Sequence, residues 1–331
     1  MLFIDDICTD PYLNLAEEEY LLKNFTEPVF RLWRNSDAII VGRYQNTLAE
    51  IDYDYVKQNE IKVVRRMTGG GAVFHDLGNL NFTFIQRRIP GEDTGAMFRR
   101  FTSPIIEALN SIGVKAYLEG RNDLLIDGKK FSGNAVCLWK ERILQHGTLL
   151  FDTSISNLSS ALRSRPEKFI GKAVQSNRSR VTNIKEHLAE PHDIEWFKDF
   201  LAKYISSNHG SDEDFEKYSF TDAQRKEIED LKRLKYGTDE WNFGSSPKFS
   251  RQSIKKFPTG LLEFYFTVDK GIITELQVKG DYFFTRPTEE FEQTLSGTHF
   301  SKESISEKLS SLNTDEFFTG ISKEDLVSLF F

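Results

Sequence analysis

The chain has 331 residues, 39% of them hydrophobic, and a net charge of −7, so it can bury the core of one large domain or two smaller ones, and it lacks the basic face of a general nucleic-acid binder. Its two cysteines, Cys8 and Cys137, provide neither a disulfide framework nor a zinc-binding spacing. We see no signal peptide and no run of about 20 apolar residues, so we expect a cytoplasmic protein that does not enter a membrane.

Hydrophobic periodicity predicts a mixture of helices and strands in the first part of the chain. Helices are expected at residues 14–25, 98–112, 192–206 and 221–237, and strands at 29–33, 38–41, 61–64, 80–84, 123–126, 131 onward and 143–152. Asp127 and Gly128 form the turn of a hairpin, and Thr221 caps the last of these helices. The polar and acidic residues 207–219 indicate a surface loop.

A domain boundary is expected near residues 244–248, which divides the chain into residues 1–245 and 246–331. Beyond it, strands are predicted at 261–268 and 272–278, and helices begin at Ser301 and Ser322. This C-terminal part has its own apolar pattern, but we find in it no cluster of chemically active residues.

One stretch combines arginines with three glycines: Arg65-Arg66-Met67-Thr68-Gly69-Gly70-Gly71-Ala72-Val73-Phe74-His75-Asp76. Glycine has no Cβ, so its backbone can approach a ligand closely, and arginine offers a planar fork for carboxylate or phosphate. Between two predicted strands, this glycine run is a candidate anion cradle. The alternative is a glycine-rich hairpin with solvated arginines, because short glycine motifs often occur without function.

A basic segment at residues 163–180 reverses the acidic charge of the chain. It carries six positive residues and one negative residue, Glu167, for a local charge of +5. Charge runs are usually solvated faces. The functional alternative is a mobile loop that closes on a phosphate-bearing ligand or meets an acidic partner.

Several further motifs follow the glycine run in a fixed order. They are Leu77-Gly78-Asn79-Leu80-Asn81-Phe82-Thr83-Phe84, Gly120-Arg121-Asn122-Asp123 with Lys130-Phe131-Ser132-Gly133-Asn134-Ala135, His146-Gly147-Thr148-Leu149-Leu150, and Ser176-Asn177-Arg178-Ser179-Arg180-Val181-Thr182-Asn183. Asn14-Leu15-Ala16 with Glu18 and Trp241-Asn242-Phe243-Gly244 with Pro247 fit the same pattern. Together they span nearly the whole chain and resemble the lipoate–protein ligases.

The resemblance implies an α+β fold with a mixed β-sheet and flanking helices, as in the biotin and lipoate ligase catalytic domains. Residues 1–245 would form this catalytic domain, and residues 246–331 a small C-terminal α/β accessory domain. In the family, the accessory domain reorients between two reaction steps.

The resemblance also implies an ATP-dependent ligase for lipoate salvage. Lipoate attacks the α-phosphorus of ATP, pyrophosphate leaves, and a lysine of an acceptor protein then attacks lipoyl-AMP. Such an enzyme must hold two anions together and offset charge on the phosphorus oxygens. Lys130 is the candidate catalytic residue, because the essential lysine of the family falls at this place in the motif. Without the resemblance to the family, Lys130 would be interpreted as an ordinary exposed lysine of a hairpin. Strand alternation should point the neighbouring Lys129 to the opposite side of the strand.

The remaining site residues are carried over from the motifs. Lipoate is expected at Arg66, Thr68, Gly69, Gly70, Gly71 and Ala72, and ATP or the adenylate at Val73, Phe74, His75, Asp76, Asn79, Asn122, Asp123, Lys130, Lys172, Arg178 and Arg180. Asp123 either binds Mg²⁺ that accompanies ATP or orients Lys130, and His75 is alternatively a packed, hydrogen-bonded histidine. Leu32, Trp33, Val73 and Phe74 are equally candidates for the lipoyl tail or for ordinary core. Where the family usually has Lys-Gly, this chain has Lys172-Ala173. The alanine puts in doubt a backbone conformation with positive φ at position 173.

The expected partners are lipoate, ATP with Mg²⁺, and an acceptor, with no tightly bound prosthetic group. The acceptor would be a lipoyl domain of a 2-oxoacid dehydrogenase E2 subunit or the glycine-cleavage H protein. Such domains are often acidic and could meet the basic segment. We expect a monomer that binds neither nucleic acid nor membrane.

Three alternatives are kept open. A transferase of the same superfamily would move octanoyl or lipoyl groups through a cysteine thioester, and Cys137 lies seven residues past Lys130. Its apolar neighbours indicate an inert buried thiol instead. A non-catalytic binder of lipoate is the second alternative, and biotin ligation, with the same chemistry, is the third.

Overall fold

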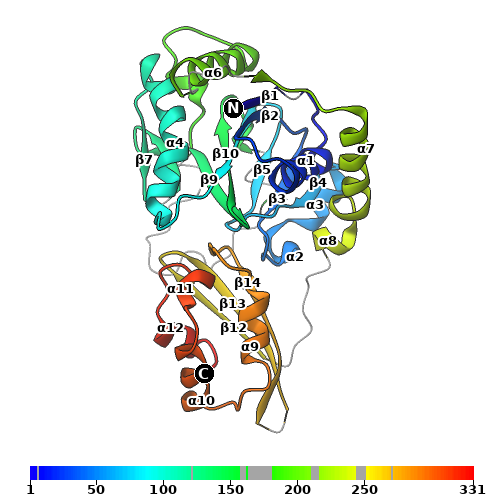
Figure 1. The fold of residues 1–331 in the computed structure, drawn as a ribbon, viewed down its shortest axis with the longest axis vertical. Coiled ribbons are helices and arrows are strands. Elements are labelled where there is room, and N and C mark those ends of the chain that lie inside the picture. Colours follow the sequence, from blue (N-terminus) through cyan, green and yellow to red (C-terminus); the bar gives the residue numbers. More distant parts are fainter. Residues whose placement is uncertain are drawn as a thin grey trace.

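The computed structural model describes residues 1–5, 7–120, 122–156, 162, 181–209, 216–243, 251–269 and 271–331. Figure 1 shows two bodies: a larger domain built from the described residues before 244, and a smaller one, here called the accessory domain, built from residues 251–331. Their hydrophobic clusters are largely separate, so each domain has a core of its own. The boundary expected at 244–248 lies outside the described residues.

The larger domain is organised around a mixed sheet of eight strands in the order β11-β1-β2-β6-β10-β9-β8-β7. The strands are β1 (Leu2–Asp5), β2 (Val29–Trp33), β6 (Asn79–Arg87), β7 (Ala116–Glu119), β8 (Asp123–Ile126), β9 (Lys129–Trp139), β10 (Arg142–Leu150) and β11 (Glu216–Lys217). β1 runs parallel to both of its neighbours, and the other neighbouring pairs are antiparallel.

A second sheet of three strands carries the glycine run. Its order is β4 (Lys62–Arg65), β3 (Ala38–Val41) and β5 (Val73–His75), with β3 parallel to β4 and antiparallel to β5. The glycine run joins β4 to β5, so it crosses over β3 instead of closing a hairpin between paired strands.

Helices cover both faces of the large sheet, because its central strands alternate their apolar side chains between the faces. Phe30 and Phe82 point to the face covered by α4 (Thr94–Ser111) and α6 (Ile194–His209). Val29 and Leu144 point to the opposite face, which is covered by α1 (Pro11–Asn24) and α7 (Asp222–Leu231). The short helices are α2 (Thr47–Glu50), α3 (Tyr53–Gln58), η3 (Ile184–His187), η4 (Lys232–Tyr236) and α8 (Asp239–Phe243).

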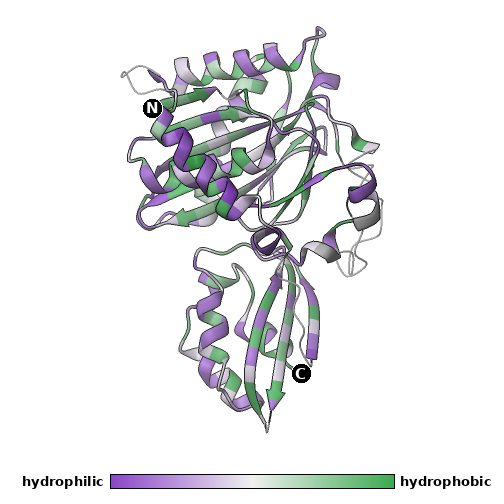
Figure 2. Cartoon of the chain, turned by 90° about the vertical axis from the view of Figure 1, so that its right-hand side faces the viewer, coloured by the Kyte–Doolittle hydropathy of each residue, from purple (hydrophilic) through white to green (hydrophobic). Residues whose placement is uncertain are grey.

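The accessory domain packs helices against the antiparallel sheet β12 (Arg251–Phe257), β13 (Gly260–Asp269) and β14 (Ile272–Gly280). Its helices are α9 (Glu289–Leu295), α10 (Lys302–Ser310), α11 (Thr314–Phe317) and α12 (Lys323–Ser328). Phe264 of β13 packs against Phe291 and Phe318, with ring centroids 6.0 and 6.4 Å away. Figure 2 shows hydrophobic and hydrophilic residues interspersed along these strands, and residues 260–266 of the central strand β13 are all buried.

Most predicted elements and the mixed α+β class are confirmed. Thr221 forms a capping box at the start of α7, and Ser301 and Ser322 cap α10 and α12. The loop expected at 207–219 is wrong at both ends: α6 continues to His209, and β11 pairs with β1. Both side chains of β11 are exposed, and β12, which was not predicted, begins with two exposed residues, so alternation marks neither. Within the described ranges, every helix is too short or too polar to cross a lipid bilayer.

Candidate active site

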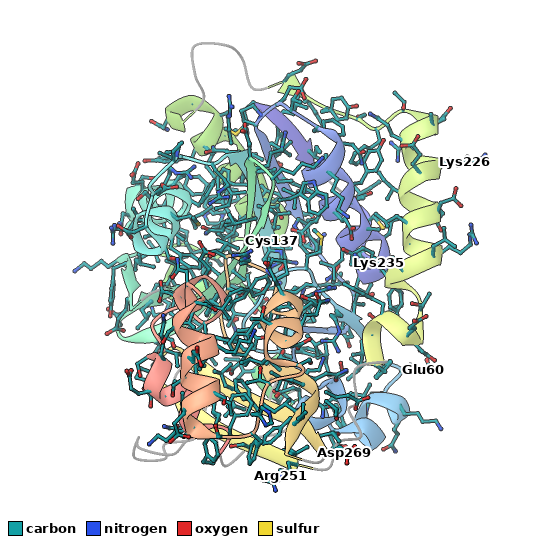
Figure 3. All side chains as sticks on the ribbon, turned by 60° about the horizontal axis from the view of Figure 1, so that its bottom comes forward. Glu60, Cys137, Lys226, Lys235, Arg251 and Asp269 are labelled. Carbon is teal, nitrogen blue, oxygen red and sulfur yellow. The ribbon has the colours of Figure 1, made fainter. Side chains whose placement is uncertain are left out.

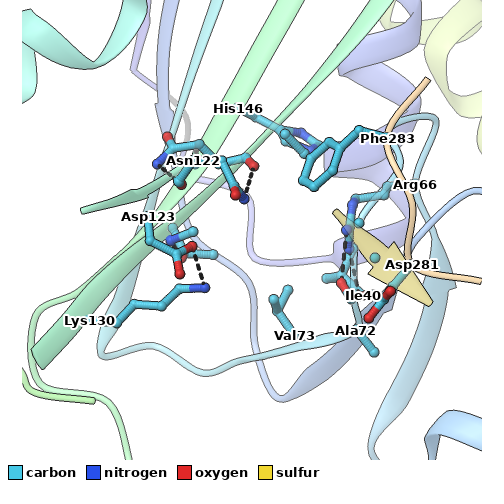
Figure 4. Close-up of a pocket in the computed structure, with 18 of the residues that line it drawn as sticks. Ile40, Arg66, Ala72, Val73, Asn122, Asp123, Lys130, His146, Asp281 and Phe283 are labelled. Atoms are coloured by element: carbon cyan, nitrogen blue, oxygen red, sulfur yellow. Dashed lines mark hydrogen bonds and ion pairs between the residues drawn. The ribbon is translucent and has the colours of Figure 1, made fainter. Parts of the chain in front are cut away.

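A cavity of about 400 Å³ opens between the large sheet, the glycine run and the accessory domain. Nine of the residues expected in the site line it: Arg66, Gly70, Gly71, Ala72, Val73, His75, Asn122, Asp123 and Lys130. In Figure 4, Lys130 and Asp123 lie on one side of the cavity, and Arg66 and Phe283 lie on the other. The fold thus brings the glycine run and the lysine motif to one place.

The floor of the cavity is the large sheet, where strand pairing arranges side chains in rows. Trp33 of β2 lies opposite Asn81 of β6, and Asn81 lies opposite Thr148 of β10. The adjacent row contains His146 of β10 and Ala135 of β9. All five residues line the cavity, because alternate positions of each strand face the same side.

Lys130 reaches the cavity because of a β-bulge in β9. Leu124 of β8 pairs with Ser132, but the next residue, Leu125, pairs with Lys130, so Phe131 is an extra residue. The bulge reverses the alternation of β9: Phe131 is buried in the core beneath α4, while Lys130 faces the cavity. Bulges often re-aim a side chain next to an active site.

The ammonium group of Lys130 forms an ion pair on the cavity wall. Its Nζ lies 2.8 Å from Asp123 Oδ1, and both side chains are 40% exposed. A Cβ at Gly133 would lie 3.2 Å from this Nζ, so glycine at this position leaves room for the ammonium group. Asn122 is held in place, since its Nδ2 donates to the carbonyl of Asn134 at 2.9 Å. Lys129 is exposed.

Arg66 closes the glycine run onto itself. Its Nη2 donates to the carbonyls of Gly69 and Gly71 at 2.7 and 2.8 Å, and its Nη1 donates to the carbonyl of Ile40 at 2.9 Å. Burial lowers the pKa of Arg66 to about 10, so the guanidinium stays charged at neutral pH. Gly70, at φ 88°, takes a backbone conformation that favours glycine. Arg66 therefore fixes the shape of the run and places a positive charge beside the cavity.

A buried network connects helix α1 to the glycine run. The His146 ring lies between Glu18, at 2.9 Å from Nδ1, and the Thr68 hydroxyl, at 2.8 Å from Nε2. The Thr68 hydroxyl also accepts a bond from Arg66 Nε at 2.8 Å. Burial acts to raise the pKa of the Glu18 carboxyl, but His146 and the Thr83 hydroxyl outweigh it, so that the pKa falls below its ordinary value. Glu18, read from the sequence only as part of a motif, thus supports Arg66 through two intermediates.

His75 lies at the cavity and carries a buried donor without a partner among the described residues. Its Nδ1 lies 3.0 Å from Asn35 Nδ2, which donates to it, so the ring proton resides on Nε2. Burial, with help from the nearby Arg66, lowers the pKa of His75 to about 3, which keeps the ring neutral. Among the described residues, the buried Nε2 finds no hydrogen-bond partner. An orphaned buried donor of this kind is unusual in a folded protein.

Five expected site residues lie behind the cavity wall, and three cannot be placed. Thr68 and Gly69 support the glycine run, and Asp76 and Asn79 are buried, with Asp76 accepting from the backbone N–H groups of Gly78 and Ser154. Phe74 points into the core because it alternates with Val73 and His75 along β5. Of the four apolar candidates, Trp33 and Val73 line the cavity, and Leu32 and Phe74 lie in the core. Lys172, Arg178 and Arg180 lie outside the described residues.

Sequence reasoning missed the contribution of the accessory domain. Lys256, Asp281 and Phe283 line the cavity, and Figure 4 shows Asp281 and Phe283 on the side opposite Lys130. Lys256 Nζ lies 3.8 Å from Asp281 Oδ1, and Phe283 packs edge-on against Phe98 with centroids 6.1 Å apart. No local sequence pattern marks these residues as part of the site, because they reach it only through the contact between the domains.

Cys137 lies on β9 among core residues that face α1, and it is half-buried. Figure 3 labels it near the middle of the view, whereas Lys226 stands at the periphery. Burial raises the pKa of its thiol to about 12, so the thiol is protonated at neutral pH and is a poor nucleophile. This environment does not favour a cysteine-dependent transferase.

Comparison with known proteins follows the same division of the chain. Residues 10–206 match the lipoyl protein ligase A/B catalytic domain, and residues 246–330 match the bacterial lipoate protein ligase C-terminus. The lipoate-protein ligase LplJ of Bacillus subtilis is 40% identical over 334 residues, covering 100% of both chains.

Two solved structures share the fold. The crystal structure of P. falciparum LipL1 in complex with lipoate has a TM-score of 0.78 at 28% identity and covers 94% of both chains. A lipoate-protein ligase A bound with ATP has a TM-score of 0.64 at 28% identity, covering 74% of this chain and 99% of that one. The resemblance seen in the motifs is confirmed over the full length: this chain belongs to the lipoate–protein ligase family.

Proposed function

We propose that this ligase uses ATP to convert lipoate into lipoyl-AMP in the cavity, and then transfers the lipoyl group to a specific lysine of an acceptor protein. The observation that carries the proposal is the position of Lys130. A β-bulge turns its ammonium group into a cavity whose far side carries the Arg66 guanidinium. Two cations that face one cavity suit a reaction that brings a carboxylate and a phosphate together.

In the first step, a carboxylate oxygen of lipoate attacks the α-phosphorus of ATP, and the bond from that phosphorus to pyrophosphate breaks. Negative charge on the α-phosphoryl oxygens is offset by the Lys130 ammonium, which Asp123 holds in place at 2.8 Å. The positive charge of Arg66 attracts the lipoate carboxylate across the cavity, although its own donors hold the glycine run. In the second step, the neutral amine of the acceptor lysine attacks the carbonyl carbon, AMP leaves with the bonding electrons, and the amine loses its proton.

We assign the nucleotide to the side of the cavity that carries Lys130, because of the residues that lie beside this lysine. The backbone N–H of Thr182 donates to the Lys130 carbonyl at 3.0 Å, so the residues after 180 lie beside the catalytic lysine. This placement supports Lys172, Arg178 and Arg180 as adenylate ligands.

Mg²⁺ enters as part of the ATP substrate. Among the described residues, we find no group of three or more His, Cys, Asp or Glu arranged to hold a metal ion. Asp123 nevertheless fits a single bond to Mg²⁺ carried by ATP phosphates, because such ions commonly use one or two carboxylates and keep several waters.

The proposed acceptors are lipoyl domains of 2-oxoacid dehydrogenases or the glycine-cleavage H protein. The thiols of Cys8 and Cys137, which are not joined in a disulfide, suit the reducing cytoplasm.

The test is lipoate-dependent exchange of labelled pyrophosphate into ATP, which measures the first step alone. We expect exchange by the wild type and a loss of at least about 100-fold in Lys130→Ala, the size typical of removing a transition-state charge partner. Lys129→Ala is the matched control: it removes the adjacent lysine, which is exposed on the same strand, and should keep wild-type exchange.

Two outcomes would overturn the proposal. One is a wild type without exchange that moves lipoyl groups from a lipoylated carrier protein, which would restore the transferase. The other is equal exchange by Lys130→Ala and Lys129→Ala, which would remove Lys130 from the reacting centre.

A further inference from the structure

Each of the two domains packs one aromatic ring against the hydrophobic cluster of the other. Tyr44 belongs to the larger domain, yet it is 6% exposed and packs within the hydrophobic cluster of the accessory domain. Phe283 belongs to the accessory domain, yet it packs against the cluster of the larger domain, edge-on to Phe98. This exchange makes the contact between the domains specific.

Tyr44 makes contacts of three kinds with the accessory domain. Its ring stacks on Tyr282, with centroids 5.5 Å apart and an interplanar angle of 5°, and meets Phe284 edge-on at 4.9 Å. Its hydroxyl donates to Glu289 Oε2 at 2.8 Å and accepts from the Thr288 backbone N–H at 3.2 Å. Its carbonyl accepts from the Gly280 N–H at 3.0 Å. A buried tyrosine with both ends satisfied is a typical anchor of an interface.

The segment anchored by Tyr44 lies directly on the glycine run. The backbone N–H of Gly70 donates to the Tyr282 carbonyl at 3.3 Å. A Cβ at Gly69 would lie 2.5 Å from this same oxygen, and one at Gly70 would lie 3.5 Å from the Phe283 ring. The glycines thus let the accessory backbone approach, a role that is distinct from cradling a ligand.

We propose that Tyr44 is a positioning residue for adenylation: it docks the accessory domain on the glycine run so that Phe283, Lys256 and Asp281 complete the wall of the lipoate pocket. The inference rests on the proposed function and extends it by making the docked accessory domain part of the substrate site. Phe283 supplies an apolar surface for the lipoyl chain, and Lys256 adds a third cation to the cavity. Without the anchor, this wall leaves the site while Lys130 and Arg66 remain.

The test is a double-mutant cycle in the pyrophosphate-exchange assay, with the KM for lipoate and kcat measured separately. Tyr44→Ala and Phe283→Ala should each raise the KM for lipoate about 10-fold and change kcat less than about 3-fold, because the wall binds substrate in the ground state. The double variant should match Tyr44→Ala alone, because loss of the anchor already removes Phe283 from the pocket. Tyr44→Phe keeps the ring contacts and should raise the KM less than Tyr44→Ala does.

Tyr265→Ala is the matched control, since it truncates a buried tyrosine of the accessory domain whose hydroxyl bonds to Glu263 within that domain. It should leave the KM within about 2-fold. Three results would each overturn the inference. The first is a KM raised about 100-fold in the double variant, the product of the two single effects. The others are an unchanged KM in Tyr44→Ala and an equal rise of the KM in Tyr265→Ala. A wild type without exchange refutes the proposed function instead, so the two failures are distinguishable.

Discussion

The neutral state of His75 can be tested through protein stability, independently of catalysis. The folded protein holds the ring with a pKa of about 3, because the ring is buried and lies near Arg66. In the unfolded chain the pKa is about 6.5. Between these values the unfolded chain binds a proton that the folded protein does not bind, so the free energy of unfolding must fall as the pH decreases through this range. The perturbation is acidification, with His75→Gln as the non-titrating reference.

The magnitude follows from the two pKa values. At pH 7.5 the ring is almost wholly neutral in both states, and the term is close to zero. At pH 5.0 the unfolded ring is about 97% protonated and the folded ring remains neutral, which costs about 2 kcal/mol of folding stability. Glutamine at position 75 does not titrate, so the variant lacks this term.

The assay is urea unfolding of both proteins at pH 7.5, 6.0 and 5.0, followed by tryptophan fluorescence. All 4 tryptophans precede residue 244, so fluorescence reports the domain that contains His75. The wild type should be the more stable protein at pH 7.5, and its advantage should shrink by about 2 kcal/mol at pH 5.0. Subtracting one protein from the other cancels the titration of the remaining groups.

A stability difference that stays constant from pH 7.5 to 5.0 would refute the reasoning. It would mean that the ring accepts a proton in the folded protein as readily as in the unfolded chain. The neutral state of the buried ring, and with it the fixed proton on Nε2, would then lose its basis.

Three further predictions concern residues around the site. Arg65→Lys should lower the free energy of unfolding of the larger domain by about 3 kcal/mol in urea, because one ammonium group cannot replace the bonds of this arginine. Arg65 is 3% exposed and donates to the backbone carbonyls of Gly42, Arg43, Gln45, Trp241 and Asn242. The control Arg87→Lys, at an exposed ion pair, should change the free energy of unfolding by less than about 0.5 kcal/mol, and equal losses in the two variants would contradict the role of Arg65. Gly69→Ala should raise the KM for lipoate in pyrophosphate exchange about 10-fold, because a Cβ would lie 2.5 Å from the Tyr282 carbonyl, and an unchanged KM would show that the contact is not needed. Cys137→Ser should keep exchange and lipoyl transfer within about 2-fold, since the thiol pKa is raised to about 12, and loss of transfer alone would revive the thioester mechanism.

The elements that define the larger domain could be predicted because their signals are local. Strand β2 coincides with the predicted strand at 29–33, since its apolar side chains mark it, and the turn at Asp127 and Gly128 takes the expected conformation with φ of 49° and 73°. Capping side chains marked three helix starts for the same reason. Strand β11 was not predicted, because backbone pairing holds its two exposed residues and leaves no hydrophobic pattern in the side chains.

The site could be predicted as a set of motifs, but not as a geometry. Lys130 was chosen by its place in a motif, whereas the bulge at Phe131 that turns it into the cavity depends on pairing with β8. The glycines at 69–71 were expected to cradle an anion, yet Gly69 and Gly70 lie against the accessory backbone. Contacts of this kind join residues about 200 positions apart, and neither propensity nor periodicity carries information over that separation.

The exchange of Tyr44 and Phe283 between the domains has a consequence for how strong their contact needs to be. Because both domains belong to one chain, each meets the other at an effective concentration on the order of millimolar. An association too weak to hold two separate proteins together at micromolar concentration is therefore well populated within this chain. A substitution at either ring therefore lowers the fraction of molecules in which the domains are docked, while the fold of each domain rests on its own hydrophobic cluster.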